Sequence, residues 1–315
     1  MLDESVVRSL VGRADARAAV RRALVALAED RAVLPGEIAM VLDAGELHVK
    51  GGYLRGSGYV SAKVAGGFPG NAAAGRPVND GFSIVLDAAT GALVAVLLDH
   101  GWLTELRTGA AGALAADLLA RPDATAVGLV GAGAQARFQI EALLDVRPVR
   151  TVRIWNRTGR RAQDLAGRLA GEFDLDATAV GTVEEAVCEA DIVVTTTASR
   201  EPLVFARWLR PGTHVTAVGS DFPDKQELSV DVLARADVVA ADRVASCARV
   251  GELHHALEAG VLAVDAVVEL AELAAGTARG RTGEDQITVA DQCGLGVYDA
   301  AMAELVLTRH LAVRP

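Results

Sequence analysis

Cysteine is scarce in this chain of 315 residues, and aromatic residues make up only 4% of it. The three cysteines, Cys188, Cys247 and Cys293, are odd in number, lie far apart and include no C-x-x-C pair. Disulfide frameworks and zinc sites are typically recognised by paired or closely spaced cysteines. The sequence therefore predicts neither disulfides nor a metal site, and it favours a reducing, cytoplasmic compartment.

Basic residues are fewer than acidic ones, and long apolar runs are absent. The chain has 31 basic and 41 acidic residues, a net charge of −10, which disfavours nucleic acid and anionic membranes as partners. The apolar run at residues 92–98 is too short to span a bilayer. Asp3, Glu4 and Arg8 stand where an export signal needs an apolar segment. We expect a cytoplasmic protein that acts on a small molecule.

What the sequence does contain is typical of a globular, two-domain chain. Hydrophobic residues make up 51% and charged residues 23%, and the length suits two domains. The spacing of apolar residues predicts a helix over 5–29. Short β-type runs then occupy residues 37–99, and AATG between the last two predicts a hairpin turn. Residues 103–120 are predicted to form a helix that leaves this first domain.

A different pattern begins at residue 125, where apolar strands alternate with helical stretches. The strand candidates are AVGLV, TVRIW, DIVVTTT, HVTAVG, DVVAAD and QITVAD. Such alternation predicts a parallel sheet covered by helices on both faces. We therefore expect an α/β protein with a Rossmann-type doubly wound sheet at residues 122–293 and a smaller α/β domain at 1–121. A last helix at 294–315 is expected to pack on either domain.

A turn of small residues follows the first of these strands. Residues 125–136 read TAVGLVGAGAQA, with Gly131, Gly133 and Ala136 at the three key positions of G-x-G-x-x-G/A. The first glycine allows a tight turn, the second lets the backbone approach a pyrophosphate, and the third small residue lets helix and strand touch. The following helix directs its free N–H groups at the phosphates. The flanking strand and helix predict a dinucleotide site.

The end of the second strand bears on the choice of nicotinamide cofactor. Sites for NAD usually have a carboxylate there to accept the ribose hydroxyls, whereas TVRIW ends in Asn156, Arg157 and Thr158. Asn156 is able to bond a hydroxyl without repelling a phosphate, and Arg157 with Arg160 or Arg161 is able to hold a 2′-phosphate. We favour NADP(H), with NAD(H) possible. Alternatively, these arginines only cap and solvate the next helix.

Asp221 is the best candidate for the proton donor or acceptor that hydride transfer requires. It lies just past the strand HVTAVG, in the segment GSDFPDKQEL. Ligands of doubly wound sheets bind beyond the carboxyl ends of the strands. Without the surrounding pattern, a turn or N-cap role would be the better interpretation of Asp221.

Four blocks now combine into a more specific pattern. WLTELRTGAAGALAA is followed by VGLVGAGAQA, then by VGSDFPDKQEL and ITVADQCGLGVYDAAMAEL. In order and spacing they resemble the ornithine cyclodeaminase/mu-crystallin family, and the similarity runs over most of the chain from about residue 60. SAKVAGGFPGNAAAGRPV also resembles the family's K-x(5)-P-x-N block.

The resemblance implies a two-domain, dimeric, NAD(P)-dependent enzyme with its active site between the domains. Members include ornithine cyclodeaminase, alanine dehydrogenase and ketimine reductases. Lys63 falls on the family's lysine that holds the substrate carboxylate, and Asp221 falls on the catalytic aspartate. Arg107 falls on an arginine that contacts the cofactor beside the substrate pocket. The first domain would bind substrate and form the dimer.

Further residues match family positions that contact the cofactor. They are Ala134, Gln135, Thr197, Val218, Gly219, Ser220 and Lys225. Gln292 is a further candidate cofactor contact, at a place where the family commonly has a pair of small residues.

Four other residues have side chains that could bind a substrate or a metal ion. Glu46 is a candidate to reach the substrate pocket, and Cys293 is a candidate substrate contact, although a buried inert thiol is the alternative. His254 and His255 have no third ligand at metal spacing, and we expect them to be structural.

The chain also departs from the family's pattern. Many members have an arginine that clamps the substrate carboxylate after the first helix, where this chain has Gly36 and Glu37. The second-strand aspartate of the cyclodeaminase is lost as well. These departures point away from authentic ornithine cyclodeaminase.

Three functions follow from this comparison. The first is an NAD(P)H-dependent oxidoreductase that transfers hydride at the α-carbon of an imino or amino acid, of the ketimine reductase or amino-acid dehydrogenase type. The second is a cyclodeaminase that forms a cyclic imino acid and releases ammonia. The third is a non-catalytic nucleotide- or hormone-binding protein of the crystallin kind, which the presence of both Lys63 and Asp221 disfavours.

Overall fold

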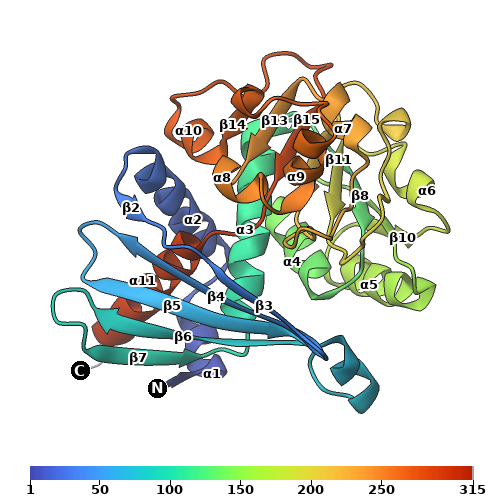
Figure 1. Cartoon of the computed structure of the whole chain (residues 1–315). Coiled ribbons are helices and arrows are strands. Elements are labelled where there is room, and N and C mark those ends of the chain that lie inside the picture. The colour runs from blue at the N-terminus through green and yellow to red at the C-terminus, as the bar shows by residue number, and fades with distance from the viewer. Residues whose placement is uncertain (314–315) are drawn as a thin grey trace. The chain divides into compact units, whose positions relative to one another are not determined.

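The computed structural model describes residues 1–313, which pack into two compact units (Figure 1). One unit contains Met1–Arg107 and the chain from Leu295 on, and the other contains Thr108–Gly294. The division falls within helix α3 (Trp102–Leu119), whereas the sequence-based limit at residue 121 assigns the whole helix to the first domain. No helix within residues 1–313 is long and apolar enough to cross a membrane.

The first unit is built on a seven-stranded sheet with the order β1-β7-β6-β5-β4-β2, in which β3 also pairs with β4. β1 runs parallel to β7, and the other pairings are antiparallel. The strands are β1 (Leu2–Asp3), β2 (Ala32–Val33), β3 (Ile38–Leu42), β4 (Gly45–Leu54), β5 (Tyr59–Gly67), β6 (Asn79–Asp87) and β7 (Leu93–Leu98).

Helix α11 (Gly296–Ala312) packs against β4 and β5, with helix α2 (Arg13–Ala28) beside it (Figure 1). The contact depends on glycine at the crossing point. A Cβ on Gly52 would lie 2.7 Å from the carbonyl oxygen of Gly296. Since only glycine permits this approach, the last helix is seated firmly on the first unit's sheet.

The N-terminal helix expected over residues 5–29 is two helices, α1 (Glu4–Leu10) and α2. Asp3 begins the first helix, since its Oδ1 accepts from the backbone N–H of Val6 at 3.0 Å. The extended backbone of Val11 ends α1, and Gly12 is the N-cap of α2, where its N–H donates to Asp15 Oδ2 at 3.0 Å. Apolar periodicity does not reveal this break.

The second unit is an eight-stranded, fully parallel sheet with the order β10-β9-β8-β11-β12-β15-β13-β14. Its strands are β8 (Ala126–Val130), β9 (Thr151–Trp155), β10 (Asp176–Ala179), β11 (Ile192–Thr195), β12 (His214–Ala217), β13 (Val238–Ala241), β14 (Val267–Glu269) and β15 (Thr288–Asp291). Its helices besides α3 are α4 (Ala134–Leu143), α5 (Gly159–Glu172), α6 (Val183–Val187), α7 (Val230–Arg235), α8 (Val244–Cys247), α9 (Gly251–Glu258) and α10 (Leu270–Ala275).

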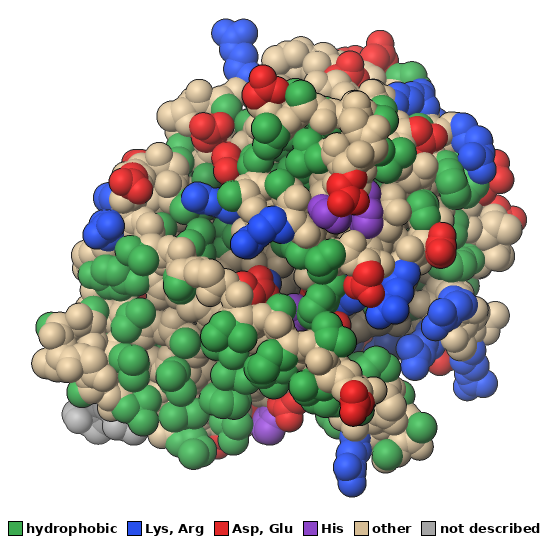
Figure 2. Space-filling model, viewed as in Figure 1, with side chains coloured by type: hydrophobic (Ala, Val, Ile, Leu, Met, Phe, Trp, Pro, Cys, Tyr) green, Lys and Arg blue, Asp and Glu red, His purple; other side chains and the backbone are tan. Residues whose placement is uncertain are grey.

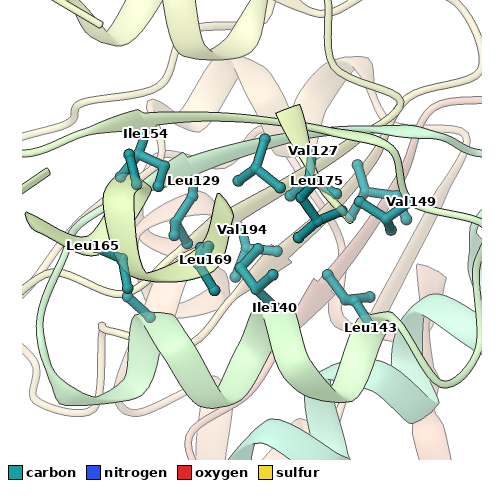
Figure 3. Packing of buried hydrophobic residues seen from close by; sticks show 14 of the residues in the cluster. Val127, Leu129, Ile140, Leu143, Val149, Ile154, Leu165, Leu169, Leu175 and Val194 are labelled. Carbon is teal, nitrogen blue, oxygen red and sulfur yellow. The ribbon is translucent and has the colours of Figure 1, made fainter. Parts of the chain in front are cut away.

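The central strands β8, β11, β12 and β15 are buried on both faces, as expected for a sheet covered by helices. Figure 3 shows Val127 and Leu129 of β8 packed with Ile140 of α4 and with Leu165 and Leu169 of α5. The strand order runs outward from β8 through β9 on one side and from β11 on the other, so it reverses between β8 and β11. Doubly wound sheets bind ligands at the carboxyl ends of the strands at such a reversal. The expected doubly wound α/β fold is confirmed.

Candidate active site

The small-residue turn lies at the carboxyl end of β8, at this reversal. Gly131 has a φ of +112°, and a Cβ there would lie 2.7 Å from Thr196 Oγ1. Both the backbone angle and the close approach of the next strand's loop require glycine. Gly133 is the N-cap of α4, and Ala136 is fully buried where the helix meets the sheet. The turn therefore has the geometry that the motif predicts.

The same turn leaves room for a pyrophosphate group. Gly133 and Ala134 are exposed, and a Cβ on Gly133 would meet no atom within 4 Å. No side chain caps α4 at Gly133, and the first N–H groups of a helix have no partner within the helix itself. Gln135 is half-buried in this first turn. A helix N-terminus with this access suits a phosphate anion. The residues present thus fit a dinucleotide.

Asn156 at the end of β9 holds the turn in place. Its Oδ1 accepts from the backbone N–H of Ala132 at 3.1 Å, and its Nδ2 donates to the carbonyl oxygen of Thr158 at 3.0 Å. Arg157, next in the chain, is exposed, and the exposed Arg160 lies 3.7 Å from Asp164. The carboxamide of Asn156 thus positions the turn, and the exposed Arg157 is the next residue in the chain.

A buried carboxylate that sequence reasoning missed connects the loops after β11 and β12. Glu227 accepts from the backbone N–H and the hydroxyl of Thr197, the latter at 2.7 Å. It also accepts from Thr195 Oγ1 at 2.7 Å and from the backbone N–H of Gly219 at 2.8 Å. Burial raises the pKa of Glu227 despite these donors. Thr197 and Gly219, both predicted cofactor contacts, therefore share one anchor.

The sequence offers little sign of this role. Glu227 stands as an acidic residue between the polar segment DFPDKQ and the apolar segment LSVDVLA. A Cβ on Gly219 would lie 2.7 Å from the Glu227 carboxyl carbon and 2.0 Å from the carbonyl oxygen of Thr197. Glycine at 219 is thus required for the two loops to close on each other.

Asp221 follows directly on this loop, next to Ser220, as expected. Lys225 Nζ donates to Asp221 Oδ1 at 2.7 Å, and Ser220 Oγ donates to the carbonyl oxygen of Lys225. The side chain of Asp221 is 34% exposed, whereas that of Lys225 is nearly buried. Lys225 therefore positions the carboxylate of Asp221, and solvent still reaches that carboxylate.

The remaining predicted residues of this unit lie at the ends of β12 and β15. Val218 is half-buried at the end of β12, beside the chain segment of Gln292. Gln292 is buried, and its Nε2 donates to the carbonyl oxygen of Ala111 at 3.1 Å. Cys293 is also buried and lies against Cys247. Its role as a substrate contact stays a prediction.

In the first unit, Lys63 and Arg107 meet at one carboxylate. Lys63 Nζ lies 3.0 Å from Asp299 Oδ2, and Arg107 Nε donates to Asp299 Oδ1 at 3.0 Å. All three side chains are buried. Burial, together with the charges of Arg107 and Lys50, lowers the pKa of Lys63 to about 8, although Asp299 opposes the shift. Burial opposes ionisation of Asp299, but Arg107 and Lys63 outweigh it and keep its pKa below the ordinary value.

A third buried cation, Lys50, stands directly opposite Lys63 in the β4–β5 register. Its Nζ lies 3.1 Å from Glu37 Oε1, which is also 2.7 Å from His48 Nδ1. Glu46 lies farther along β4, half-buried opposite Gly67. Sequence reasoning did not identify Lys50 or Asp299, because each looks like an ordinary polar residue of a strand or helix.

Comparison with known proteins identifies the family of this chain. The model of the ornithine cyclodeaminase/mu-crystallin family matches residues 1–313. The chain belongs to this family. The resemblance drawn from the sequence blocks is confirmed.

Several relatives of this family member cover most of its length. An uncharacterized cyclodeaminase of Sinorhizobium fredii is 46% identical over 84% of this chain and 80% of its own. An alanine dehydrogenase of Archaeoglobus fulgidus is 34% identical over 99% of this chain and 95% of its own. A Δ1-pyrroline-2-carboxylate reductase of Paracoccus denitrificans is 34% identical over 94% of each chain.

Solved structures show the same fold. An archaeal alanine dehydrogenase, described as a dimer with bound NAD, has a TM-score of 0.92 at 34% identity and covers 99% of this chain and 95% of its own. The Thermococcus litoralis Δ1-pyrroline-2-carboxylate reductase, in complex with NADH and L-proline, has a TM-score of 0.94 at 28% identity, covering 99% and 97%. The iminosuccinate reductase of Paracoccus denitrificans, in complex with NAD+, has a TM-score of 0.87 at 30% identity, with the same coverage.

Proposed function

We propose that this family member is an NADP(H)-preferring reductase of an imino acid, and that its reverse reaction is the oxidation of the corresponding amino acid. The broader class, a nicotinamide-dependent oxidoreductase acting on imino or amino acids, is confirmed by the relatives. The observation that carries the proposal is the place of Asp221. It is a solvent-accessible carboxylate on the loop after β12, in a unit with a complete dinucleotide turn.

Asp221 handles the proton of the reaction. The nicotinamide, when bound, supplies the hydride for the C=N carbon. Asp221 exchanges the accompanying proton with the substrate nitrogen, directly or through water. The ammonium group of Lys225, 2.7 Å from Asp221 Oδ1, orients the carboxylate toward this task.

Lys63 and Arg107 bind the substrate carboxylate. An imino acid brings a carboxylate that a cationic side chain recognises by charge-assisted hydrogen bonds. Asp299 keeps both cations oriented, since it bonds to each of them. Glu46 is retained as a further substrate contact, and Ala134, Gln135, Val218, Ser220 and Gln292 are retained as cofactor contacts.

A substrate screen tests this function. We would follow NADPH oxidation with cyclic imines, and with 2-oxo acids supplied with ammonia or methylamine. The proposal requires turnover in at least one set, with loss of about 100-fold or more in kcat for Asp221→Asn. Asp224→Asn is the matched control, because Asp224 is an exposed carboxylate on the same segment that pairs with Arg200. Full activity of Asp221→Asn would contradict the assigned role.

The preference for NADP(H) rests on Arg157. This exposed guanidinium follows the strand end where NAD enzymes usually have a carboxylate. Dissociation constants for NADPH and NADH test the preference, together with Arg157→Ala. We expect the variant to bind NADPH about tenfold more weakly and NADH unchanged, because only the 2′-phosphate is lost as a partner. Equal or tighter binding of NADH by the native protein would overturn it.

A cyclodeaminase is the second candidate, because the Sinorhizobium fredii relative carries that name. Such an enzyme oxidises its substrate, loses ammonia after intramolecular attack and reduces the product again. Stoichiometry separates the two candidates. A reductase consumes one nicotinamide per turnover, whereas a cyclodeaminase releases ammonia without net consumption of the cofactor.

We also propose a homodimer formed through the sheet of the first unit, in line with the dimeric archaeal neighbour. Figure 2 shows hydrophobic side chains crowded on this unit's face. Exposed apolar surface marks interaction sites when it is extensive. The exposed apolar residues on this unit's strands are Val33, Ile38, Met40, Val41, Leu42, Phe82, Leu93 and Val94. Light scattering on the native protein and on Val41→Asp tests this, since the charge would weaken a dimer built there.

A further inference from the structure

Two of the three cysteines, 46 positions apart in the sequence, come together in the interior of the second unit. Cys247 ends α8 and Cys293 follows β15, and their Sγ atoms lie 3.3 Å apart. Cys247 Sγ also lies 3.4 Å from Oδ1 of Asp242, which follows β13. Cys247 and Asp242 have no exposed surface, and Cys293 is only 7% exposed. The two sulfurs and a carboxylate oxygen all lie within 4.8 Å of one another.

The carboxylate of Asp242 is held in this orientation by the backbone. Its Oδ2 accepts from the N–H of Gly294 at 2.7 Å, so that Oδ1 is directed at Cys247. Such a bond from a second residue is typical of the shell that orients metal ligands.

The surroundings of the sulfurs are negative. Cys247 Sγ also lies 3.6 Å from the carbonyl oxygen of Asp291, and the carboxyl groups of Asp242 and Asp291 are both buried. Two thiols and two carboxyl groups are thus gathered in the interior of this unit. Cysteine sulfur and carboxylate oxygen are ligands that a zinc-type cation accepts.

We propose that Cys247, Cys293 and Asp242 bind a divalent cation of the zinc type. Bond lengths of about 2.3 Å to sulfur and 2.0 Å to oxygen place two tetrahedral sulfurs about 3.8 Å apart, and a sulfur and an oxygen about 3.5 Å apart. The observed separations of 3.3 and 3.4 Å differ from these by about half an ångström or less. Ordinary side-chain adjustment therefore suffices to admit the ion.

Gly251 preserves space beside the proposed ligands. Its φ is +83°, and a Cβ there would lie 2.8 Å from both Cys293 Sγ and Asp291 Oδ2. Glycine at 251 is therefore required for Cys293 and the carboxylate of Asp291 to pack against this turn, and that carboxylate is the candidate fourth ligand. The ion would tie α8 and the loop after β13 to the chain segment of Gln292.

Binding of the cation releases two protons and involves no change of oxidation state, so it needs no oxidant. The cation replaces the two thiol protons, which pass to solvent, and forms two bonds to sulfur and one to the carboxylate oxygen. A disulfide would instead require a peroxide or another two-electron oxidant to reach buried thiols. We therefore favour the metal, and oxidation becomes an outcome of the test.

The test uses the untagged full-length protein, reduced and freed of metal by a chelator. Zinc is added, excess is removed by gel filtration, and zinc per chain is measured by mass spectrometry of the metal. We expect about one zinc ion per chain. Cys247→Ser and Cys293→Ser should each weaken binding by more than about tenfold. Cys188→Ser is the matched control and should bind as the native protein does, because Cys188 is a half-buried cysteine at the end of α6 and is not among the clustered ligands.

Two further measurements protect the test against variants that fold poorly. Cobalt(II) added to the native protein should give the near-ultraviolet charge-transfer absorption of a thiolate ligand, and Asp242→Asn should weaken zinc binding while both thiols remain. Affinity should also fall by up to about 100-fold per pH unit on acidification, since two protons compete with the ion. Native protein without retained zinc, zinc retained equally by Cys247→Ser, or a mass two hydrogens lower without metal would each overturn the proposal.

Discussion

Lys63 and Asp299 form a buried ion pair although 236 positions separate them in the sequence. Lys63 lies on β5 and Asp299 on α11, and Lys63 Nζ approaches both carboxylate oxygens, at 3.1 and 3.0 Å. Arg107 shares the same carboxylate. The last helix of the chain thus supplies the counter-charge for the two cations that we assign to the substrate carboxylate, and it sets their direction.

Asp299→Asn is expected to destabilise the protein strongly. The change leaves two buried cations with one neutral partner, and breaking a buried pair in this way typically costs about 3–5 kcal/mol. The free energy of unfolding, measured in urea, checks this. Glu4→Gln is the control, because Glu4 forms an exposed pair with Arg8 in the same unit and should change stability by less than about 1 kcal/mol. Equal, small losses in both variants would contradict the pairing.

The affinity for substrate is expected to fall as the pH rises through about 8. Burial lowers the pKa of Lys63 to about 8, so its ammonium is charged below that pH and loses its proton above it. Only the charged form attracts a carboxylate. KM measured against pH should therefore rise on the alkaline side for the native enzyme.

Lys63→Arg provides the comparison, since a guanidinium keeps its charge throughout this range. Whatever its overall activity, the rise of KM should move to higher pH in this variant. An unchanged alkaline limb would mean that another group causes the dependence.

Three glycine-to-alanine variants should separate cofactor binding from folding. Gly133→Ala adds a methyl group to open space at the start of α4, so stability should change by less than about 1 kcal/mol while NADPH affinity falls by more than about tenfold. Gly131→Ala should lose stability as well, because its φ is +112° and its Cβ would meet Thr196. Melting curves with and without NADPH measure both effects.

Gly167→Ala is the control for these variants. Gly167 is exposed within α5, with no atom near its added Cβ, so alanine should stabilise the helix by about 0.5–1 kcal/mol and leave cofactor affinity unchanged. Normal NADPH binding by Gly133→Ala would rule out a pyrophosphate at this turn.

Glu227→Gln should weaken cofactor binding indirectly, because Glu227 holds the two loops that carry the predicted cofactor contacts Thr197 and Gly219. The amide replaces one acceptor oxygen by a donor, leaving buried N–H or O–H groups of Thr195, Thr197 or Gly219 without an acceptor, at about 1–3 kcal/mol each. The loops after β11 and β12 lose their shared anchor. We expect the dissociation constant for NADPH to rise about tenfold or more, as calorimetry would measure.

Glu185→Gln is matched to this change, because Glu185 also accepts two backbone N–H groups, those of Gly181 and Thr182, but on the surface at α6. It should leave NADPH affinity as it was. A similar loss of affinity in both variants would show that general destabilisation, not the anchor, is responsible.

Much of this architecture was available from the sequence because the signals are local. The alternation of apolar strands with helices predicted the parallel sheet, and the spacing of Gly131, Gly133 and Ala136 predicted the turn, since period and backbone freedom are properties of neighbouring residues. The break at Gly12 was missed because the extended backbone of Val11 and Gly12 and the contact of Asp15 with the Gly12 N–H, not periodicity, decide it.

The sequence by itself determined the family, the cofactor turn and the position of Asp221 after β12. Only the tertiary structure decided which distant side chains meet: Asp299 with Lys63, Glu227 beneath two loops, and Cys247 with Cys293. The scarcity of cysteine excluded a metal site by spacing alone, yet strand order brings the loops after β13 and β15 together. Such meetings depend on how helices and strands pack across long stretches of chain, which no local pattern encodes.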